Sequence, residues 1–156
     1  MNIEKLDPAS DAAGRLIALS DVYMAALYPA ESNHLESLTA LAQDNVMFLG
    51  CHIDGQLAAC GAVKILFDVD AQLNYGEIKR VFVPDEFRGK GLSKLIMRAL
   101  EDHLLAHDIR VARLETGIRQ PEALSLYFRL GYAERAAFGD YEENPLSVFM
   151  EKNLLA

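Results

Sequence analysis

The strongest repeating pattern in the sequence lies between Leu92 and Leu104, where apolar residues return every three or four positions. That spacing gathers them on one face of an amphipathic helix, which must pack against other structure. Similar patterns predict two helices before it, over 11–27 and from about 33 to 42. A fourth helix is predicted over 121–129, because a proline stands in its first turn and Gly131 follows its end.

The segments between these helices are typical of β-strands. Asp54-Gly55 is a tight hairpin signal, and it separates strand-like residues 46–53 from 56–67. Further strands are predicted over 2–6, 73–83, 111–116, 132–136 and 147–152. This order predicts an α/β fold, a mixed sheet of about six or seven strands flanked by about four helices. Because no repeat or linker interrupts the 156 residues, we expect a single domain over 1–156.

The composition excludes several classes of protein. Hydrophobic residues make up 51% and charged residues 24%, which is typical of a globular protein and not of a disordered one. A net charge of −8 argues against a nucleic-acid partner. No apolar run suits a membrane span, and the first residues do not resemble a signal peptide, so we expect a cytoplasmic protein. Cys51 and Cys60 lack metal-ligand neighbours, so we expect two buried thiols and no metal.

Positive charge gathers in one segment of this acidic chain, at Lys79, Arg80, Arg88, Lys90, Lys94 and Arg98. Within it, residues 81–93 read as the end of a strand, a glycine-bearing turn and the start of a helix. Such a turn frees backbone N–H groups, and a helix N-terminus adds partial positive charge, so the segment suits a pyrophosphate. It matches neither the P-loop nor the dinucleotide motif. From these residues alone, an ordinary loop before a helix explains the segment equally well.

Arg88-Gly89-Lys90-Gly91-Leu92-Ser93 resembles the signature of the GNAT family of N-acetyltransferases. In that signature an Arg or Gln is followed three positions later by Gly and five positions later by Gly or Ala. The last position departs from it, because Ser93 stands there. Two further stretches resemble the family in order and spacing, 114–117 and 121–132, and the likeness extends from about Val46 to Leu154. Segments 27–34 and 138–150 resemble a bacterial subgroup labelled indole-3-acetate acetyltransferases.

The resemblance implies the GNAT fold, with a V-shaped opening beside the strand that ends at Val83, next to strand 111–116. It implies acetyl-CoA as cosubstrate, with its pantetheine arm along the backbone of Val81, Phe82 and Val83. The pyrophosphate would lie on Arg88, Gly89, Lys90, Gly91, Leu92, Ser93 and Lys94. Gln120 stands where many members have an Asn that touches the cofactor arm. A residue that merely introduces the helix at 121 is the alternative for Gln120.

The resemblance also implies the catalytic groups. Glu77 falls where one branch of the family carries its general base, and it alternates with Tyr75, Lys79, Val81 and Val83 on one strand face. We expect Glu77 to be the base, acting directly or through one water, with Glu115 as the second candidate. Glu115 falls where another branch places the base. Tyr127 coincides with the tyrosine beside the cofactor sulfur, where it would protonate the leaving thiolate. A salt-bridged carboxylate is the alternative for each Glu, and a packed core ring is the alternative for Tyr127.

For the acceptor, the resemblance points to two loops. Ser32, Asn33 and His34 lie in a segment that lines the acceptor side in this family. Asp140, with Glu142 and Glu143, lies in a loop that can face the same cleft, where acidic lining suits a cationic acceptor. Two ordinary exposed loops would explain these residues equally well. We therefore expect an enzyme that transfers an acetyl group to a primary amine of a small molecule or peptide. A non-catalytic acyl-CoA-binding sensor is the alternative, and the sequence leaves a homodimer open.

Overall fold

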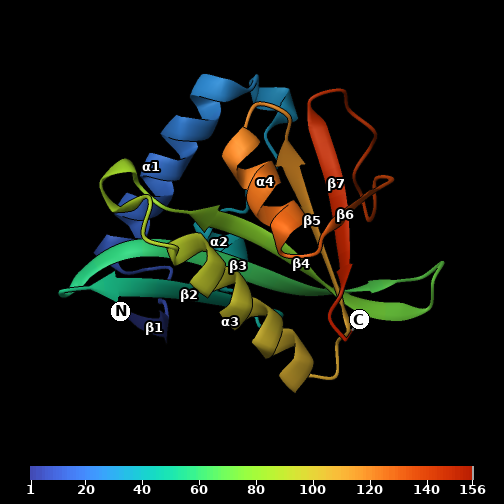
Figure 1. The fold of residues 1–156 in the computed structure, drawn as a ribbon, viewed down its shortest axis with the longest axis horizontal. Coiled ribbons are helices and arrows are strands. Elements are labelled where there is room, and N and C mark those ends of the chain that lie inside the picture. Colours follow the sequence, from blue (N-terminus) through green and yellow to red (C-terminus); the bar gives the residue numbers. More distant parts are fainter. Residues whose placement is uncertain (156) are drawn as a thin grey trace.

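The computed structural model describes residues 1–155. A single seven-stranded sheet is flanked by helices on both faces (Figure 1). Its strands are β1 (Asn2–Lys5), β2 (Val46–Ile53), β3 (Gln56–Asp68), β4 (Leu73–Phe82), β5 (Val111–Gly117), β6 (Ala133–Arg135) and β7 (Ser147–Asn153). The helices are α1 (Asp11–Leu27), α2 (Leu38–Leu41), α3 (Leu92–Ala106) and α4 (Pro121–Arg129), with short 3₁₀ turns η1 (Ala30–Ser32) and η2 (Asp85–Phe87). Within the described range, every helix is too short or too polar to cross a bilayer.

The sheet opens in its middle. Its order is β1-β2-β3-β4-β5-β7-β6, and β4 and β5 are parallel neighbours. Their pairing runs only from Gly76, opposite Ala112, to Ile78, opposite Leu114. Beyond those pairs β4 continues to Phe82 and β5 continues to Gly117, and Figure 1 shows the two arrowheads pointing apart. This confirms the predicted α/β fold and its V-shaped opening beside β4.

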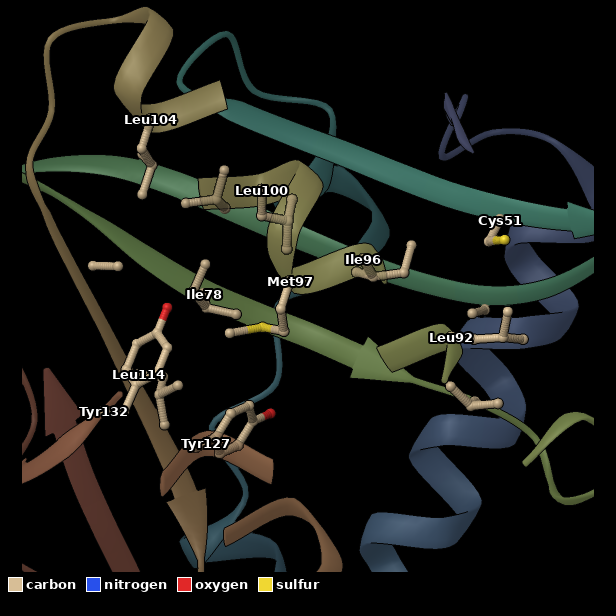
Figure 2. Close-up of a cluster of buried hydrophobic side chains, with 14 of the residues drawn as sticks. Cys51, Ile78, Leu92, Ile96, Met97, Leu100, Leu104, Leu114, Tyr127 and Tyr132 are labelled. Carbon is tan, nitrogen blue, oxygen red and sulfur yellow. The ribbon is translucent and has the colours of Figure 1, made fainter. Parts of the chain in front are cut away.

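Two separate cores hold the helices against opposite faces of the sheet. On one face α3 buries Leu92, Ile96, Met97, Leu100 and Leu104 against strand residues such as Ile78 and Leu114 (Figure 2). On the other face α1 buries Ala13, Leu16 and Ile17 against Phe48, Cys60, Ala62 and Phe82. Successive strand residues point to opposite faces, so the alternation of β2 and β3 supplies both cores. The free thiols of Cys51 and Cys60 are buried, as the sequence predicts.

The helix predicted from about Asn33 to Ala42 is wrong in its first half. Only Leu38–Leu41 is helical, and Asn33 to Ser37 is irregular. Ser37 ends the irregular stretch, because its hydroxyl accepts a hydrogen bond from the N–H of Ala40 at 3.1 Å and so caps α2. The irregular stretch is also held from outside, since the Glu36 carbonyl accepts from Nε of Arg80 at 2.9 Å. That contact keeps the segment beside β4, where it lines the site.

Candidate active site

Three hollows lie along β4, and one of them reaches into the opening between β4 and β5. The groove, of about 740 Å³, runs between the end of β4, the start of α3 and α4. The inner hollow, of about 80 Å³, lies between β4, β5, α1 and the 136–146 loop. The outer hollow, of about 720 Å³, lies farther along β4. The groove and the inner hollow share Val81, Gln120 and Tyr127 in their walls, so those residues mark where the two meet.

The groove contains the predicted glycine-bearing turn. Gly89 and Gly91 have φ angles of 81° and 75°, a backbone region that favours glycine. A Cβ at either would meet nothing within 4 Å, so the backbone conformation, and not lack of space, calls for glycine there. Gly91 is the N-cap of α3, and no side chain caps that helix start. Free N–H groups and the helix dipole together favour an anion at this end of the groove.

Fewer cations reach the groove than the sequence cluster suggests. Arg88 and Lys94 line it, but Lys90 is exposed and is not among the lining residues. Arg88 is partly engaged already, because its Nη1 lies 3.0 Å from Asp85 and its Nε donates to the Val83 carbonyl at 3.0 Å. Lys79 and Arg80 bond to groups on the α1 side of the sheet. Arg129, which the sequence analysis missed, lines the groove from the last turn of α4.

A β-bulge in β4 separates the two ends of that strand. Arg80 has a φ of 56°, and the register with β3 shifts between Cys60 and Ala62. Before the bulge, Glu77 faces the inner hollow. After it, Val81 and Val83 pack into the α3 core, while Phe82 packs on the α1 side. The prediction that Val81 and Val83 share a face with Glu77 is therefore wrong, because the extra residue reverses the alternation.

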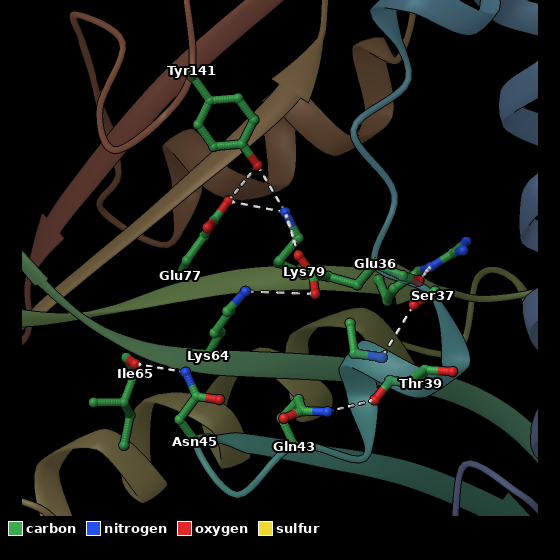
Figure 3. A network of polar contacts seen from close by, with 12 residues as sticks. Glu36, Ser37, Thr39, Gln43, Asn45, Lys64, Ile65, Glu77, Lys79 and Tyr141 are labelled. Atoms are coloured by element: carbon green, nitrogen blue, oxygen red, sulfur yellow. Dashed lines mark hydrogen bonds and ion pairs between the residues drawn. The ribbon is translucent and has the colours of Figure 1, made fainter.

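Glu77 is buried in a polar network at the boundary of the inner and outer hollows (Figure 3). Its Oε2 lies 3.2 Å from Nζ of Lys79 and accepts from the Tyr141 hydroxyl at 2.5 Å. The same Lys79 ammonium donates to the Tyr141 hydroxyl at 2.7 Å and lies 3.3 Å from Glu36. Burial and the Glu77 charge raise the pKa of Tyr141, so this phenol stays protonated. Glu77 is thus an ion-paired and hydrogen-bonded carboxylate.

Glu115 has a different environment, although it lines the same inner hollow. Burial raises its pKa to about 7, against the lowering effects of a hydrogen bond from Ser147 and the charge of Lys79. The Ser147 hydroxyl donates to Oε2 of Glu115 at 2.8 Å and holds the side chain. A carboxyl group with a pKa near 7 exchanges a proton readily at neutral pH, which suits a general base.

Tyr127 stands at the junction of the groove and the inner hollow. Its ring is buried against the α3 core, with the Tyr132 ring centroid 6.0 Å away. Burial, together with the charge of Glu115, raises the pKa of Tyr127 to about 12. The phenol therefore keeps its proton at neutral pH, so in a proton transfer it can act as an acid and not as a base. Packing and acid function are both compatible with this position, so its assigned role stays a prediction.

The predicted acceptor residues divide between the inner hollow and the outer hollow. Ser32 lines the inner hollow, Asn33 and Asp140 line the outer hollow, and His34 lines both. Nδ2 of Asn144, in the 136–146 loop, donates to the Ser32 hydroxyl at 3.3 Å. The rings of His34 and Tyr141 meet edge to face at 5.1 Å. The structure thus brings the two sequence segments 27–34 and 138–150 together over the same cleft.

Sequence reasoning missed several residues of the inner hollow, among them Tyr28, Glu36 and Tyr141. Tyr28 and Tyr141 lie inside the two segments singled out by resemblance, but no spacing distinguishes a cleft tyrosine from a loop one. The only local signal for Tyr28 is the proline that follows it, because that proline ends α1 and leaves Tyr28 as the first residue beyond the helix. Glu36 falls in the first half of the helix predicted over about 33–42, and that half is irregular in the structure, so the prediction hid the place of Glu36 in the site.

Comparison with known proteins supports one family. The model of the Acetyltransferase (GNAT) family matches residues 16–132. An "IAA acetyltransferase" of Azospirillum brasilense is 40% identical over 154 residues, covering 99% of this chain and 98% of that protein. The uncharacterized N-acetyltransferase YsnE of Bacillus subtilis is 31% identical over 133 residues, with 84% and 85% covered.

Solved structures share the fold along nearly the whole chain. A crystal structure from Klebsiella pneumoniae, described provisionally as an acyl-CoA N-acyltransferase, has a TM-score of 0.79 at 33% identity, covering 98% and 97% of the two chains. The PaiA N-acetyltransferase of Thermoplasma acidophilum, solved with coenzyme A, has a TM-score of 0.74 at 18% identity, covering 97% and 98%. At 18% identity, the likeness to the Thermoplasma protein shows a shared fold and nothing more.

Proposed function

Because this chain belongs to the GNAT family and is therefore an acetyltransferase, we propose that it moves the acetyl group of acetyl-CoA to a primary amine by direct attack on the thioester. Family members use acyl-CoA, and the chain offers a matching place for it. The observation that carries the proposal is the meeting of the anion-binding groove and the carboxylate-lined inner hollow at Val81, Gln120 and Tyr127.

The residues of the groove fit coenzyme A on physical grounds. The start of α3, with Arg88 and Lys94 beside it, would hold the pyrophosphate. Past Ile78, the edge of β4 that faces β5 is free of strand pairing, so the backbone of Val81 to Val83 can bond an extended amide-bearing arm. This arrangement would bring the reacting end of the cofactor to Tyr127, where the groove meets the inner hollow.

The charge of the outer hollow favours a cationic acceptor. Its lining includes two lysines, Lys64 and Lys79, and six carboxylates: Glu31, Glu36, Glu77, Asp140, Glu142 and Glu143. Such a wall attracts an ammonium group and repels an anion. The name of the Azospirillum relative suggests a second candidate acceptor, IAA. Indole-3-acetate is an anion, so it would meet this wall unfavourably, and it belongs in the test as a competing acceptor.

Within the inner hollow each ionisable group has a task suited to its protonation. When bound, acetyl-CoA supplies the acyl group and a thiolate leaving group. Glu115, with its pKa near 7, accepts the proton that the amine loses as its nitrogen bonds to the acyl carbon. Tyr127, still protonated, donates a proton to the departing sulfur. Glu77, tied to Lys79 and Tyr141, holds the acceptor's cationic end, and it is the second candidate for the base.

The experiment compares acceptors that differ only in reactivity or charge. Purified protein with acetyl-CoA is offered primary amines, their N,N-dimethyl analogues and indole-3-acetate, and free thiol is measured. The dimethyl analogues keep the cation but cannot form an amide. We expect thiol release with primary amines only. Release with indole-3-acetate alone would favour the second acceptor, and coenzyme A binding without release for any acceptor would favour the non-catalytic sensor.

A further inference from the structure

Tyr28 is the first residue beyond α1, and its side chain reaches from that helix to the turn between β5 and α4. The residue is buried, with 6% of its surface exposed, and it lines the inner hollow. Its hydroxyl lies where a Cβ of Gly117 would be, at only 1.9 Å from that position. Glycine at 117 is therefore a condition for the Tyr28 hydroxyl to reach the turn.

The hydrogen bonds of Tyr28 determine where its proton points. The backbone N–H of Arg119 donates to the phenol oxygen at 3.0 Å. The phenol then donates its single proton to Oε1 of Gln120, at 3.2 Å. Burial raises the pKa of Tyr28, which keeps that proton in place. The hydroxyl thus accepts from Arg119 and donates to Gln120. Because only the amide oxygen of Gln120 can accept that proton, the amide has a single orientation, with its oxygen toward Tyr28.

That orientation has a direct consequence for the groove. Because Oε1 of Gln120 faces Tyr28, its NH₂ group is directed away from Tyr28 with two donors. Gln120 is the N-cap of α4, but its side chain makes no capping hydrogen bond, so helix capping does not use that amide. Gln120 lines both the groove and the inner hollow. Its donors are therefore available where the reacting arm of an acyl-CoA would pass.

Other contacts hold the same turn against α1. The Arg119 guanidinium donates to the Leu27 carbonyl, and its carbon lies 5.8 Å from the centre of the Tyr28 ring. The N–H of Gln120 donates to the Gly117 carbonyl at 3.2 Å, so the backbone of the turn is closed as well. The backbone of the turn and the ring of Tyr28 are both held in place. The side-chain amide of Gln120 can therefore move mainly by rotating its amide group, and the hydrogen bond from Tyr28 restricts that rotation.

We propose that Tyr28 is a positioning residue, which fixes the amide of Gln120 so that its NH₂ group donates to a carbonyl oxygen on the arm of the bound acyl-CoA. This rests on the proposed use of acyl-CoA but not on the identity of the acceptor. It gives segment 27–34 a role on the cofactor side as well as in lining the acceptor cleft. The Tyr28 hydroxyl then connects segment 27–34, on the acceptor side, with Gln120 in the cofactor groove.

The test measures the affinity for coenzyme A by calorimetry with no acceptor present. Tyr28→Phe removes the orienting hydroxyl, and we expect the dissociation constant to rise roughly three- to tenfold, the usual effect of one hydrogen bond. Gln120→Ala should produce a similar loss. In the Gln120→Ala background, adding Tyr28→Phe should change the affinity no further, because the residue through which Tyr28 acts is gone.

Two further variants separate positioning from simple stability. Gln120→Glu can still accept from Tyr28, but it has lost both donors and turns a carboxylate oxygen toward the carbonyl oxygen of the arm. It should therefore fold normally and bind coenzyme A at least tenfold more weakly, a larger loss than that of Gln120→Ala. Tyr132→Phe removes the hydroxyl of another buried tyrosine, which donates to Glu101 at 2.8 Å. Tyr132 is not among the described residues that line the groove. Tyr132→Phe should lower the melting temperature and leave the affinity unchanged.

Equal losses from Tyr28→Phe in both backgrounds would overturn the inference, and so would a parental affinity in Gln120→Glu. Because coenzyme A binding is read without any acceptor, the outcome is independent of amine acetylation. A chain that acetylates no amine can still show the predicted coupling of Tyr28 and Gln120. Conversely, an active amine acetyltransferase without that coupling would retain the proposed function and lose this inference.

Discussion

Replacing Glu115 by Gln should stabilise the protein at alkaline pH while abolishing its turnover. A carboxyl group whose pKa is higher in the folded chain than in the unfolded chain binds its proton more tightly when folded. The pKa of Glu115 rises from 4.5 to about 7. The parent therefore loses stability as pH rises from about 4.5 to about 7, and Gln, which mimics the protonated form, removes that loss.

The size of the effect follows from the shift. Two and a half pH units at about 1.4 kcal/mol each give about 3 kcal/mol at pH 8. For a domain of this size that corresponds to a rise in Tm of roughly 6–12 °C. The hydrogen bond from Ser147 survives, because the amide oxygen of Gln accepts as the carboxylate does. At pH 4.5 and below, Glu115→Gln and the parent should melt together.

The assay is thermal unfolding of parent and variant at pH 4.5, 6 and 8, with thiol release measured on the same samples. Glu134→Gln is the matched control, since Glu134 is exposed on β6 and its replacement should shift Tm little at any pH. A Tm difference that stays constant or shrinks as pH rises would refute a raised pKa for Glu115. Parental turnover in the variant would move the role of base to Glu77.

Three further changes test other parts of the site. Tyr127→Phe should lower kcat by roughly 10²–10⁴ with coenzyme A affinity intact, whereas parental kcat in single-turnover measurements would reduce Tyr127 to a packing residue. Gly91→Asp should abolish coenzyme A binding measured by calorimetry, while Gly55→Asp, at a similar φ of 78° in an open turn, should leave it unchanged. Tyr141→Phe, which removes a hydrogen bond to Glu77, should raise KM for the amine but not for acetyl-CoA, and equal rises in both would argue against an acceptor role.

Much of the fold could be predicted because its signals are local. The bounds of β2 and α4 are those expected from apolar pattern, Pro121 and the turn residues. At the β2–β3 hairpin both turn residues, Asp54 and Gly55, have positive φ, as the dipeptide predicts. These features depend on residues within a few positions of one another, so a sequence displays them directly.

The bulge in β4 could not be predicted, because its support comes from distant residues. Nη1 of Arg80 lies 3.2 Å from the Ser20 hydroxyl and 2.7 Å from Asp21, both on α1, and its Nε bonds the Glu36 carbonyl. These contacts hold a non-glycine residue at positive φ, which a period-two pattern does not indicate. The same limit explains why the faces of Val81 and Val83 were assigned wrongly.

The two candidate bases are alike in sequence and differ only in tertiary surroundings. Both Glu77 and Glu115 lie on strands beside the opening, and both line the inner hollow. Glu77 is matched by the ammonium of Lys79 and the hydroxyl of Tyr141, whereas Glu115 has one neutral hydroxyl bonded to it. Burial without a close cation is what raises the pKa of Glu115, and no motif records it.

The most direct test of amine acetylation at this site is to follow a labelled acetyl group. Acetyl-CoA carrying ¹³C in its acetyl group is incubated with the protein and a small-molecule cell extract, and the labelled products are identified by mass spectrometry. The account predicts that label appears on primary amines as amides, and that it does not appear with Glu115→Gln. Label found only in free acetate or on a carboxylate acceptor would contradict the account.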